Sequence, residues 1–136
     1  MTLIAVDTSV AVPLLVASHP AHAAVTAWAR GRTLTLSGHA LAETYSVLTR
    51  LPGDARVSSP DAVALIDANF NEAAVLDDER FRRIHRELAE RGIAGGAVYD
   101  GLVGAAAHAH DLPLATRDAR ARATHEAIGT IVELLT

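Results

Sequence analysis

Short apolar runs alternate along this chain with stretches in which apolar residues recur every three or four positions. Continuous or alternating apolar runs indicate strands, and recurrence at i, i+3 or i+4, and i+7 indicates amphipathic helices. The first run, residues 3–6, is apolar throughout, as is typical of a strand buried on both faces of a parallel sheet. Further strands are predicted at 34–36, 73–76, 112–116 and 130–135. Helices are predicted at 10–16, 20–30, 39–51, 60–70, 79–91, 97–110 and 119–127.

This alternation predicts an α/β fold in which helices cover both faces of a central, mainly parallel sheet. No linker or internal repeat interrupts the pattern, so a single domain over residues 1–136 is expected. Pro13 is expected in the first turn of its helix, where a missing N–H is tolerated. Phe81, Ile84 and Leu88 recur at helical spacing and are expected on the buried side of the helix at 79–91. The arginines and glutamates of that helix are expected to form salt bridges on its exterior.

The composition excludes several kinds of chemistry. The chain has no cysteine, which removes disulfides, thiolate metal ligands and cysteine nucleophiles. All 12 basic residues are arginines, which excludes lysine Schiff bases and phosphate-binding loops that need a lysine. The net charge of -4 argues against a surface coated with positive charge, although it permits a local arginine cluster. No apolar run has the length of a signal peptide or a membrane span, so a cytoplasmic location is expected.

Two of the predicted strands end on an aspartate. Asp7 follows the first strand, and Asp118 follows the strand at 112–116. The carboxyl ends of parallel strands share one edge of an open sheet, where ligands bind, so the two carboxylates are expected to meet there. Taken alone, Asp7 is better explained as a cap of the helix that follows it. Together the two aspartates favour a site, and the hydroxyl of Thr8 or Ser9 is then expected to cap the next helix, leaving the Asp7 carboxylate free.

Two further acids, Glu43 and Asp100, lie in helical stretches that are otherwise apolar. A charge on an apolar helix face is costly unless it is paired or binds a metal ion. A solvated helix edge is the alternative for Glu43, and a favourable position near a helix N-terminus is the alternative for Asp100.

Four short motifs occur in order along the chain: Asp7-Thr8-Ser9, Ala42-Glu43, Gly95-Gly96-Ala97-Val98-Tyr99-Asp100 and Leu114-Ala115-Thr116-Arg117-Asp118. With them, nearly the whole chain resembles the PIN-domain nucleases, and within these the VapC-like toxins of bacterial toxin–antitoxin pairs. The resemblance implies a PIN-like, three-layer α/β/α fold. It also implies an acidic pocket formed by Asp7, Glu43, Asp100 and Asp118, with Thr116 as its accompanying hydroxyl. Gly101 departs from the pattern, since such proteins more often carry alanine there.

The residue types agree with the activity that the resemblance implies, the hydrolysis of RNA phosphodiester bonds by metal-activated water. Neighbouring carboxylates raise one another's proton affinity unless a cation neutralises them. Oxygen ligands without cysteine or a histidine pair favour Mg²⁺ or Mn²⁺, which bind a phosphodiester oxygen and lower the pKa of a bound water. Asp7 and Asp100 are expected as primary ligands, Asp118 as a second or water-mediated ligand, and Glu43 as a ligand or an orienter of the water. The resemblance further implies a small antitoxin from the same operon and a homodimer.

The remaining candidates carry weaker signals. Arg117, Arg120 and Arg122 flank Asp118 and are candidates for holding an RNA backbone, although a solvated helix face explains them as well. The histidines are expected to be structural or solvated, because His125-Glu126 lacks the second histidine of an H-E-x-x-H metal motif. Phosphoryl-transfer domains with an acid at a strand end are disfavoured because they rely on a lysine. A non-catalytic RNA- or protein-binding module of the same fold stays open as the alternative.

Overall fold

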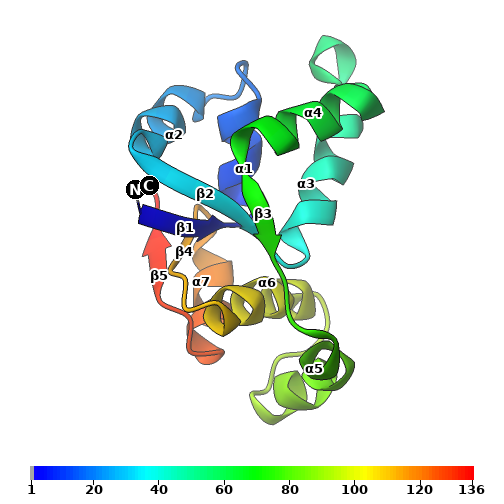
Figure 1. Cartoon of the computed structure of the whole chain (residues 1–136), viewed down its shortest axis with the longest axis vertical. Helices are drawn as coiled ribbons and strands as arrows, with labels where there is room; N and C mark the ends of the chain where they lie inside the picture. Colours follow the sequence, from blue (N-terminus) through cyan, green and yellow to red (C-terminus); the bar gives the residue numbers. More distant parts are fainter. Residues whose placement is uncertain (1) are drawn as a thin grey trace.

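A five-stranded parallel sheet lies at the centre of the computed structural model, which describes residues 2–136 (Figure 1). Its strand order is β3-β2-β1-β4-β5, so that β1 is central, and each of the four strand pairings is parallel. The strands are β1 (Thr2–Val6), β2 (Arg32–Ser37), β3 (Asn71–Ala74), β4 (Leu114–Thr116) and β5 (Val132–Leu134). The predicted α/β fold with a parallel sheet is therefore confirmed.

Seven α-helices cover the two faces of this sheet. They are α1 (Thr8–Leu15), α2 (His22–Ala29), α3 (Ala40–Thr49), α4 (Ser59–Asn69), α5 (Asp78–Glu90), α6 (Ala97–Ala109) and α7 (Ala119–Ala127). A 3-10 turn, η1 (Gly53–Ala55), connects α3 to α4. In Figure 1, α1 to α4 lie on one side of the sheet and α5 to α7 on the other, which gives three layers. Within residues 2–136, no helix combines the length and the hydrophobicity needed to cross a membrane.

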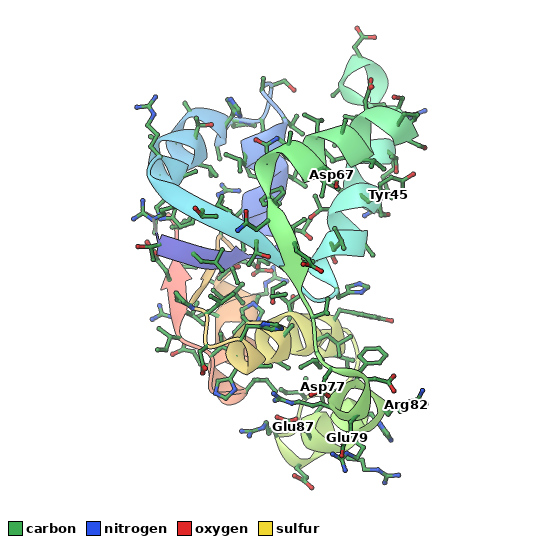
Figure 2. The ribbon with its side chains drawn as sticks, in the orientation of Figure 1. Tyr45, Asp67, Asp77, Glu79, Arg82 and Glu87 are labelled. Carbon is green, nitrogen blue, oxygen red and sulfur yellow. The ribbon has the colours of Figure 1, made fainter. Side chains whose placement is uncertain are left out.

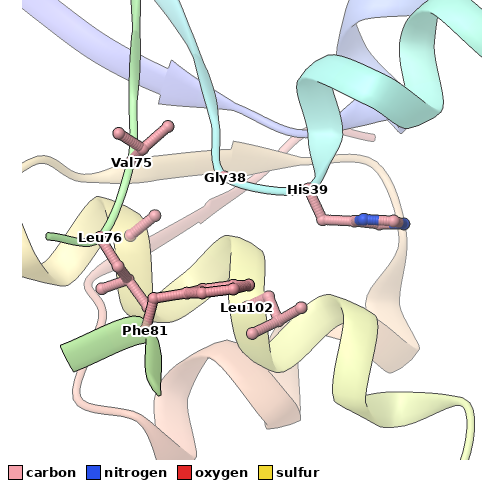
Figure 3. Close-up of a pocket in the computed structure, with 7 residues that line it drawn as sticks. Gly38, His39, Val75, Leu76, Phe81 and Leu102 are labelled. Atoms are coloured by element: carbon pink, nitrogen blue, oxygen red, sulfur yellow. The ribbon is translucent and has the colours of Figure 1, made fainter. Parts of the chain in front are cut away.

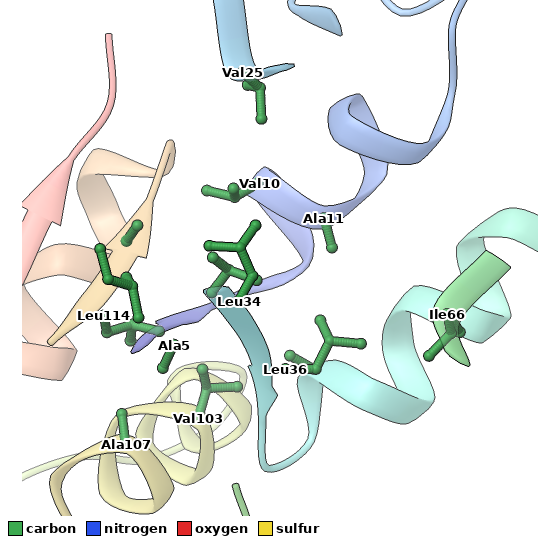
Figure 4. Packing of buried hydrophobic residues seen from close by; sticks show 14 of the residues in the cluster. Ala5, Val10, Ala11, Val25, Leu34, Leu36, Ile66, Val103, Ala107 and Leu114 are labelled. Carbon is green, nitrogen blue, oxygen red and sulfur yellow. The ribbon is translucent and has the colours of Figure 1, made fainter. Parts of the chain in front are cut away.

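The core forms around β1 and its neighbours. Ala5 and Val6 of β1 are fully buried, and side chains from the helices on both faces pack against the strand (Figure 4). Burial on both faces explains why this strand is a continuous apolar run rather than an alternating one. A second, smaller cluster joins Ile84 and Leu88 of α5 to Ile128 beyond α7.

Side-chain caps set the start of several helices. The Ser58 hydroxyl accepts a hydrogen bond from the Asp61 backbone N–H and so caps α4. The Asp77 carboxylate caps α5 by accepting from the Arg80 backbone N–H at 2.7 Å. The exterior of α5 carries the predicted ion pairs, among them Arg82 with Asp78 at 3.0 Å, and its charged side chains project away from the sheet (Figure 2).

Three expectations about local structure are wrong. Strand β3 covers 71–74 rather than 73–76, because this edge strand pairs with β2 across a register shift. Phe81 is 57% exposed, so only Ile84 and Leu88 form the buried side of α5. Pro13 lies in the sixth position of α1, past its first turn, because the helix begins at Thr8. Proline cannot donate to the carbonyl four residues earlier, so the Ser9 carbonyl lacks that helical partner.

Candidate active site

The carboxyl ends of β1 and β4 bring the two strand-end motifs together. Val6 pairs with Ala115 in the sheet, so Asp7 follows β1 next to the place where Thr116 ends β4. The Asp7 backbone N–H continues this pairing by donating to the Ala115 carbonyl at 3.4 Å. Side chains more than 100 residues apart in sequence therefore share one edge of the sheet.

Asp7 is only 7% exposed, and three hydrogen bonds hold its carboxylate. Its Oδ1 accepts from the Ser9 backbone N–H at 3.1 Å and from the Ser9 hydroxyl at 2.6 Å. Its Oδ2 accepts from the Thr116 hydroxyl at 2.5 Å. Asp7 is thus itself the N-cap of α1, and the expectation that Thr8 or Ser9 provides the cap is wrong. The Ser9 hydroxyl instead bridges two segments, since it also accepts from the Arg117 backbone N–H at 2.8 Å.

Thr116 connects Asp7 to Asp118. Besides donating to Asp7, the fully buried Thr116 hydroxyl accepts from the Asp118 backbone N–H at 3.1 Å. The exposed Asp118 side chain is the N-cap of α7, where its Oδ1 accepts from the backbone N–H groups of Arg120 at 2.9 Å and Ala121 at 3.4 Å. One Asp118 oxygen is therefore engaged in capping.

Asp100 lies in the first turn of α6 and is half-buried. Burial raises the pKa of its carboxyl above the usual value of 3.8, and the negative charges of Asp118, Asp7 and Glu43 raise this pKa further. His125 acts in the opposite direction and lowers the Asp100 pKa. The other three acids expected in the pocket are therefore close enough to Asp100 to act on it electrostatically.

Glu43 occupies the first turn of α3 and is exposed, so the expectation of an acid on a buried helix face is wrong for this residue. Its helix starts close to α6 because Gly38 permits a tight approach. Gly38 has φ +52°, and a Cβ atom there would lie 3.0 Å from the Leu102 carbonyl oxygen of α6. The His39 ring also stacks on that of Tyr99, with ring centroids 4.9 Å apart. These contacts join the N-terminal turns of the helices that carry Glu43 and Asp100.

The donor set suits a hard divalent cation, because every predicted ligand offers carboxylate oxygen. The mutual repulsion that raises the Asp100 pKa would also be relieved by a bound cation. Among residues 2–136, however, no three histidine, aspartate or glutamate side chains are close enough to enclose a metal ion as they stand. The carboxylates converge without forming a closed ligand cage.

The structure places His125 of α7 next to Asp7, which was not predicted from the sequence. Its side chain is fully buried, and its Nε2 lies 3.9 Å from Oδ2 of Asp7. Ala121 and Ile128, four residues before and three residues after it, are also buried. This helical spacing of apolar residues is the sequence signal from which burial of the histidine could have been predicted.

The three candidate arginines differ in their surroundings. The Arg117 guanidinium reaches the Ser9 carbonyl at 3.5 Å, the carbonyl that Pro13 leaves without its helical partner. Arg122 pairs with Glu126 at 3.0 Å on the surface of α7. Arg120 is exposed beside Asp118, and its side chain forms no ion pair within the described part of the chain.

The structure also contains an apolar cavity of about 260 Å³ (Figure 3). Its walls come from the start of α3, the segment after β3, and helices α5 and α6. They are formed by Gly38, His39, Val75, Leu76, Phe81, Leu102 and Ala106. The walls contain no carboxylate, so this cavity is distinct from the candidate site.

Comparison with known proteins shows what this chain is similar to. A family model described as "PIN domain" matches residues 4–127. The chain is 55% identical over 129 residues to "Ribonuclease VapC27" of Mycobacterium tuberculosis, which covers 95% of this chain and 94% of that protein. It is 45% identical over 137 residues to "Ribonuclease VapC40" of the same species, covering 98% of this chain and 100% of that protein.

Two solved structures share the fold. VapBC2 from Rickettsia felis, crystallised with a DNA fragment from its promoter, has a TM-score of 0.67 at 15% sequence identity and covers 99% of this chain and 100% of that chain. VapBC-5 from Mycobacterium tuberculosis, a member of the VapBC family of toxin-antitoxin systems, has a TM-score of 0.56 at 19% identity with the same coverage. At these identities the likeness concerns the fold alone.

Proposed function

This chain belongs to the PIN-domain family, and from that premise we propose that it is a Mg²⁺- or Mn²⁺-dependent endoribonuclease and the toxin of a toxin–antitoxin pair. Two relatives that align over nearly their whole length are named ribonucleases. The proposed substrate is RNA, and the reaction is hydrolysis of its phosphodiester bonds.

The observation that carries this proposal is the approach of three carboxylates to a fourth, that of Asp100. Burial raises the pKa of Asp100, and the charges of Asp118, Asp7 and Glu43 raise it further, although the four acids belong to four different parts of the chain. Such an arrangement disfavours the folded state unless something binds there. Strained electrostatics of this kind cluster at functional sites, and a metal-assisted nuclease is the function that needs several carboxylates together.

Each of the four acids has a proposed role. Asp7 and Asp100 would hold the cation as primary ligands, Asp118 would hold it through its free oxygen or a water, and Glu43 would hold it or orient the attacking water. Thr116 keeps the Asp7 carboxylate in one orientation by donating to Oδ2. When bound, Mg²⁺ or Mn²⁺ supplies Lewis-acid polarisation of a phosphoryl oxygen and lowers the pKa of a water. Arg120, exposed beside Asp118, contacts the RNA backbone.

The proposed partners follow from the relatives. Both solved neighbours are toxin-antitoxin assemblies, which supports a small antitoxin from the same operon as the partner of this chain. The protein itself is proposed to form a homodimer in the cytoplasm. Co-purification with the product of the neighbouring open reading frame tests the first point, and recovery of an unpartnered, non-toxic monomer would count against both.

The decisive experiment is cleavage of a panel of structured RNAs with Mg²⁺ or Mn²⁺, with and without chelator. Asp7→Asn and Asp100→Asn are expected to lower the cleavage rate by about 100-fold or more, because each removes a charge from the site. Asp67→Asn, which neutralises an exposed acid on α4, is the matched control and is expected to cleave like the unmodified protein. Cleavage that survives both the chelator and Asp7→Asn would refute the proposal, as would RNA binding without cleavage of any RNA.

A further inference from the structure

Arg117 is a half-buried cation without an anionic partner. No carboxylate lies within ion-pair distance of its guanidinium in the part of the chain that the structure describes. The other two half-buried arginines are both engaged, since Arg80 forms an ion pair within α5 and Arg32 donates to the Trp28 carbonyl. The Arg117 side chain reaches only the Ser9 carbonyl, at 3.5 Å, so most of its five N–H donors are unused. A half-buried charge of this kind calls for an anionic ligand.

The Arg117 side chain lines a groove of about 240 Å³ between α2 and the end of β5, the α2–β5 groove. The Trp28 indole is held there by two contacts. Its Nε1–H donates to Glu133 at 3.0 Å, and the Arg32 guanidinium lies 4.9 Å from the centroid of its ring. The groove therefore places an aromatic ring of fixed orientation beside an unpaired cation. The rest of its wall is largely apolar and includes Ala24, Val25, Leu134 and Leu135.

The α2–β5 groove adjoins the candidate active site. The Arg117 backbone N–H donates to the Ser9 hydroxyl at 2.8 Å, and this hydroxyl donates in turn to Asp7. The Leu135 backbone N–H donates to the Thr116 carbonyl at 2.8 Å. The wall of the groove is thus bonded directly to the two residues that hold the Asp7 carboxylate.

We propose that the α2–β5 groove holds one nucleotide of the RNA substrate, with its base against Trp28 and a phosphate on Arg117. The inference rests on the proposed RNA substrate. The groove is smaller than the roughly 300–1,000 Å³ of pockets for drug-sized ligands and suits a single planar base. Bases of any sequence stack on aromatic rings, and a guanidinium binds phosphate through paired N–H donors. The net charge of -4 gives no general attraction for RNA, so affinity has to come from local cations of this kind.

The fluorescence of Trp28 tests the base contact directly, because this residue is the only tryptophan in the chain. Titration with a short single-stranded RNA, in the presence of a chelator that prevents metal-dependent cleavage, is expected to quench the fluorescence until the protein is saturated. Ribose 5-phosphate carries the phosphate without a base and is expected to leave the fluorescence unchanged. Fluorescence that RNA does not quench, or that ribose 5-phosphate quenches equally, would overturn the inference.

Two substitutions in α2 test whether the groove itself binds RNA. Ala24→Leu fills the groove, whereas Ala23→Leu adds the same side chain to α2 outside it. Both positions are exposed, so both variants are expected to fold. Ala24→Leu is expected to weaken RNA binding by about 5- to 100-fold, the equivalent of losing one stacked base. Ala23→Leu is the matched control and is expected to bind RNA like the unmodified protein.

The salt dependence of RNA binding tests the phosphate contact. Arg117→Gln is expected to reduce the slope of log affinity against log salt concentration by about 0.7, the value for one phosphate contact of a single strand. Arg117→Lys keeps the charge and is expected to keep the slope. Arg86→Gln is the matched control, because it removes the same charge from an exposed arginine of α5 that forms no ion pair within residues 2–136. Its slope is expected to stay unchanged.

Several results of these measurements would overturn the inference. Equal RNA affinities of Ala24→Leu and Ala23→Leu would exclude the base site, and an unchanged slope in Arg117→Gln would exclude the phosphate contact. If Ala24→Leu abolishes co-purification with the product of the neighbouring open reading frame and leaves RNA binding unchanged, the groove binds that protein instead. If Ala24→Leu fails to fold, the quenching of Trp28 and the salt slope still decide.

The same data distinguish this inference from the proposed function, because binding is measured without metal ions. If the variants rank as expected but no RNA is cleaved with Mg²⁺ or Mn²⁺, the ribonuclease proposal fails and the nucleotide site stands. If RNA is cleaved and Ala24→Leu binds RNA like Ala23→Leu, the nucleotide site fails alone. A protein that neither binds nor cleaves RNA overturns both.

Discussion

The hydrogen bond from Thr116 to Asp7 is the contact on which the geometry of the site depends most directly. It joins the ends of β1 and β4 at 2.5 Å, and both partners are buried. Hydrogen bonds to charged groups contribute about 1.5–3 kcal/mol to stability, more than bonds between neutral groups. Removing either partner is therefore expected to lower the free energy of unfolding. Once one partner is gone, removing the other is expected to cause little further loss.

A double-mutant cycle measures this shared energy. Thr116→Val keeps the shape of the side chain and removes the hydroxyl, and Asp7→Ala removes the carboxylate. Valine buries an extra methyl group worth about 0.8 kcal/mol, which offsets part of the loss, so Thr116→Val alone is expected to destabilise the protein by about 0.7–2.2 kcal/mol. The coupling energy between the two substitutions is expected to be about 1.5–3 kcal/mol, because the cycle cancels effects that belong to one residue alone.

Urea unfolding of the four proteins at pH 7, with an unchanged m-value as the test of a common unfolding transition, gives the coupling energy. Thr130→Val combined with Asp7→Ala is the matched control, since the Thr130 hydroxyl donates to the Gly104 carbonyl instead. That pair is expected to be additive within about 0.5 kcal/mol. Additivity in the Thr116–Asp7 cycle would refute the claim that this bond holds the carboxylate.

Two further predictions concern Asp100 and Gly38. Because folding raises the Asp100 pKa, the stability of the protein falls as the pH rises from 3.8 through the raised pKa. Asp100→Asn is therefore expected to be more stable than the unmodified protein at pH 7. Urea unfolding is expected to show that this advantage disappears toward pH 4. In the same assay, Gly38→Ala is expected to lower the free energy of unfolding by about 2–4 kcal/mol, because of backbone strain and a clash with α6. The control Gly53→Ala, also at positive φ but in open space, is expected to lower it by about 1–2 kcal/mol. Equal losses would contradict the close approach of α3 and α6.

The fold was predictable because its main signals are local. The apolar run of β1, the caps at Ser58 and Asp77 and the alternation of strands with helices can all be recognised in short windows of sequence. The two strand-end acids were also predictable, because any two central parallel strands present their carboxyl ends at the same edge. Their approach required only that β1 and β4 be neighbours, which the structure confirms.

Features that depend on distant partners were not predictable. Thr8 or Ser9 was expected to cap α1, but the Ser9 hydroxyl donates to Asp7 and accepts from the backbone N–H of Arg117, which lies 108 residues away in sequence. His125 was grouped with the ordinary histidines, because its position behind Asp7 depends on how α7 packs against α6. Phe81 has the spacing of a buried residue, yet it is 57% exposed, because it lines the apolar cavity beside α6 instead of packing into the core.

The Asp7 carboxylate caps α1 and is also the proposed metal ligand. Its two oxygens have different hydrogen-bond partners. Oδ1 accepts from Ser9 and so starts α1, whereas Oδ2 faces Thr116 and His125. Loss of activity on replacing Asp7 therefore mixes a lost helix cap with a lost ligand. Thr116→Val removes the donor to Oδ2 and leaves both Ser9 donors to Oδ1, although it also removes the acceptor of the Asp118 backbone N–H. If this substitution weakens Mn²⁺ binding while α1 and α7 stay folded, the orientation of Asp7 is what the site requires, and not merely its presence.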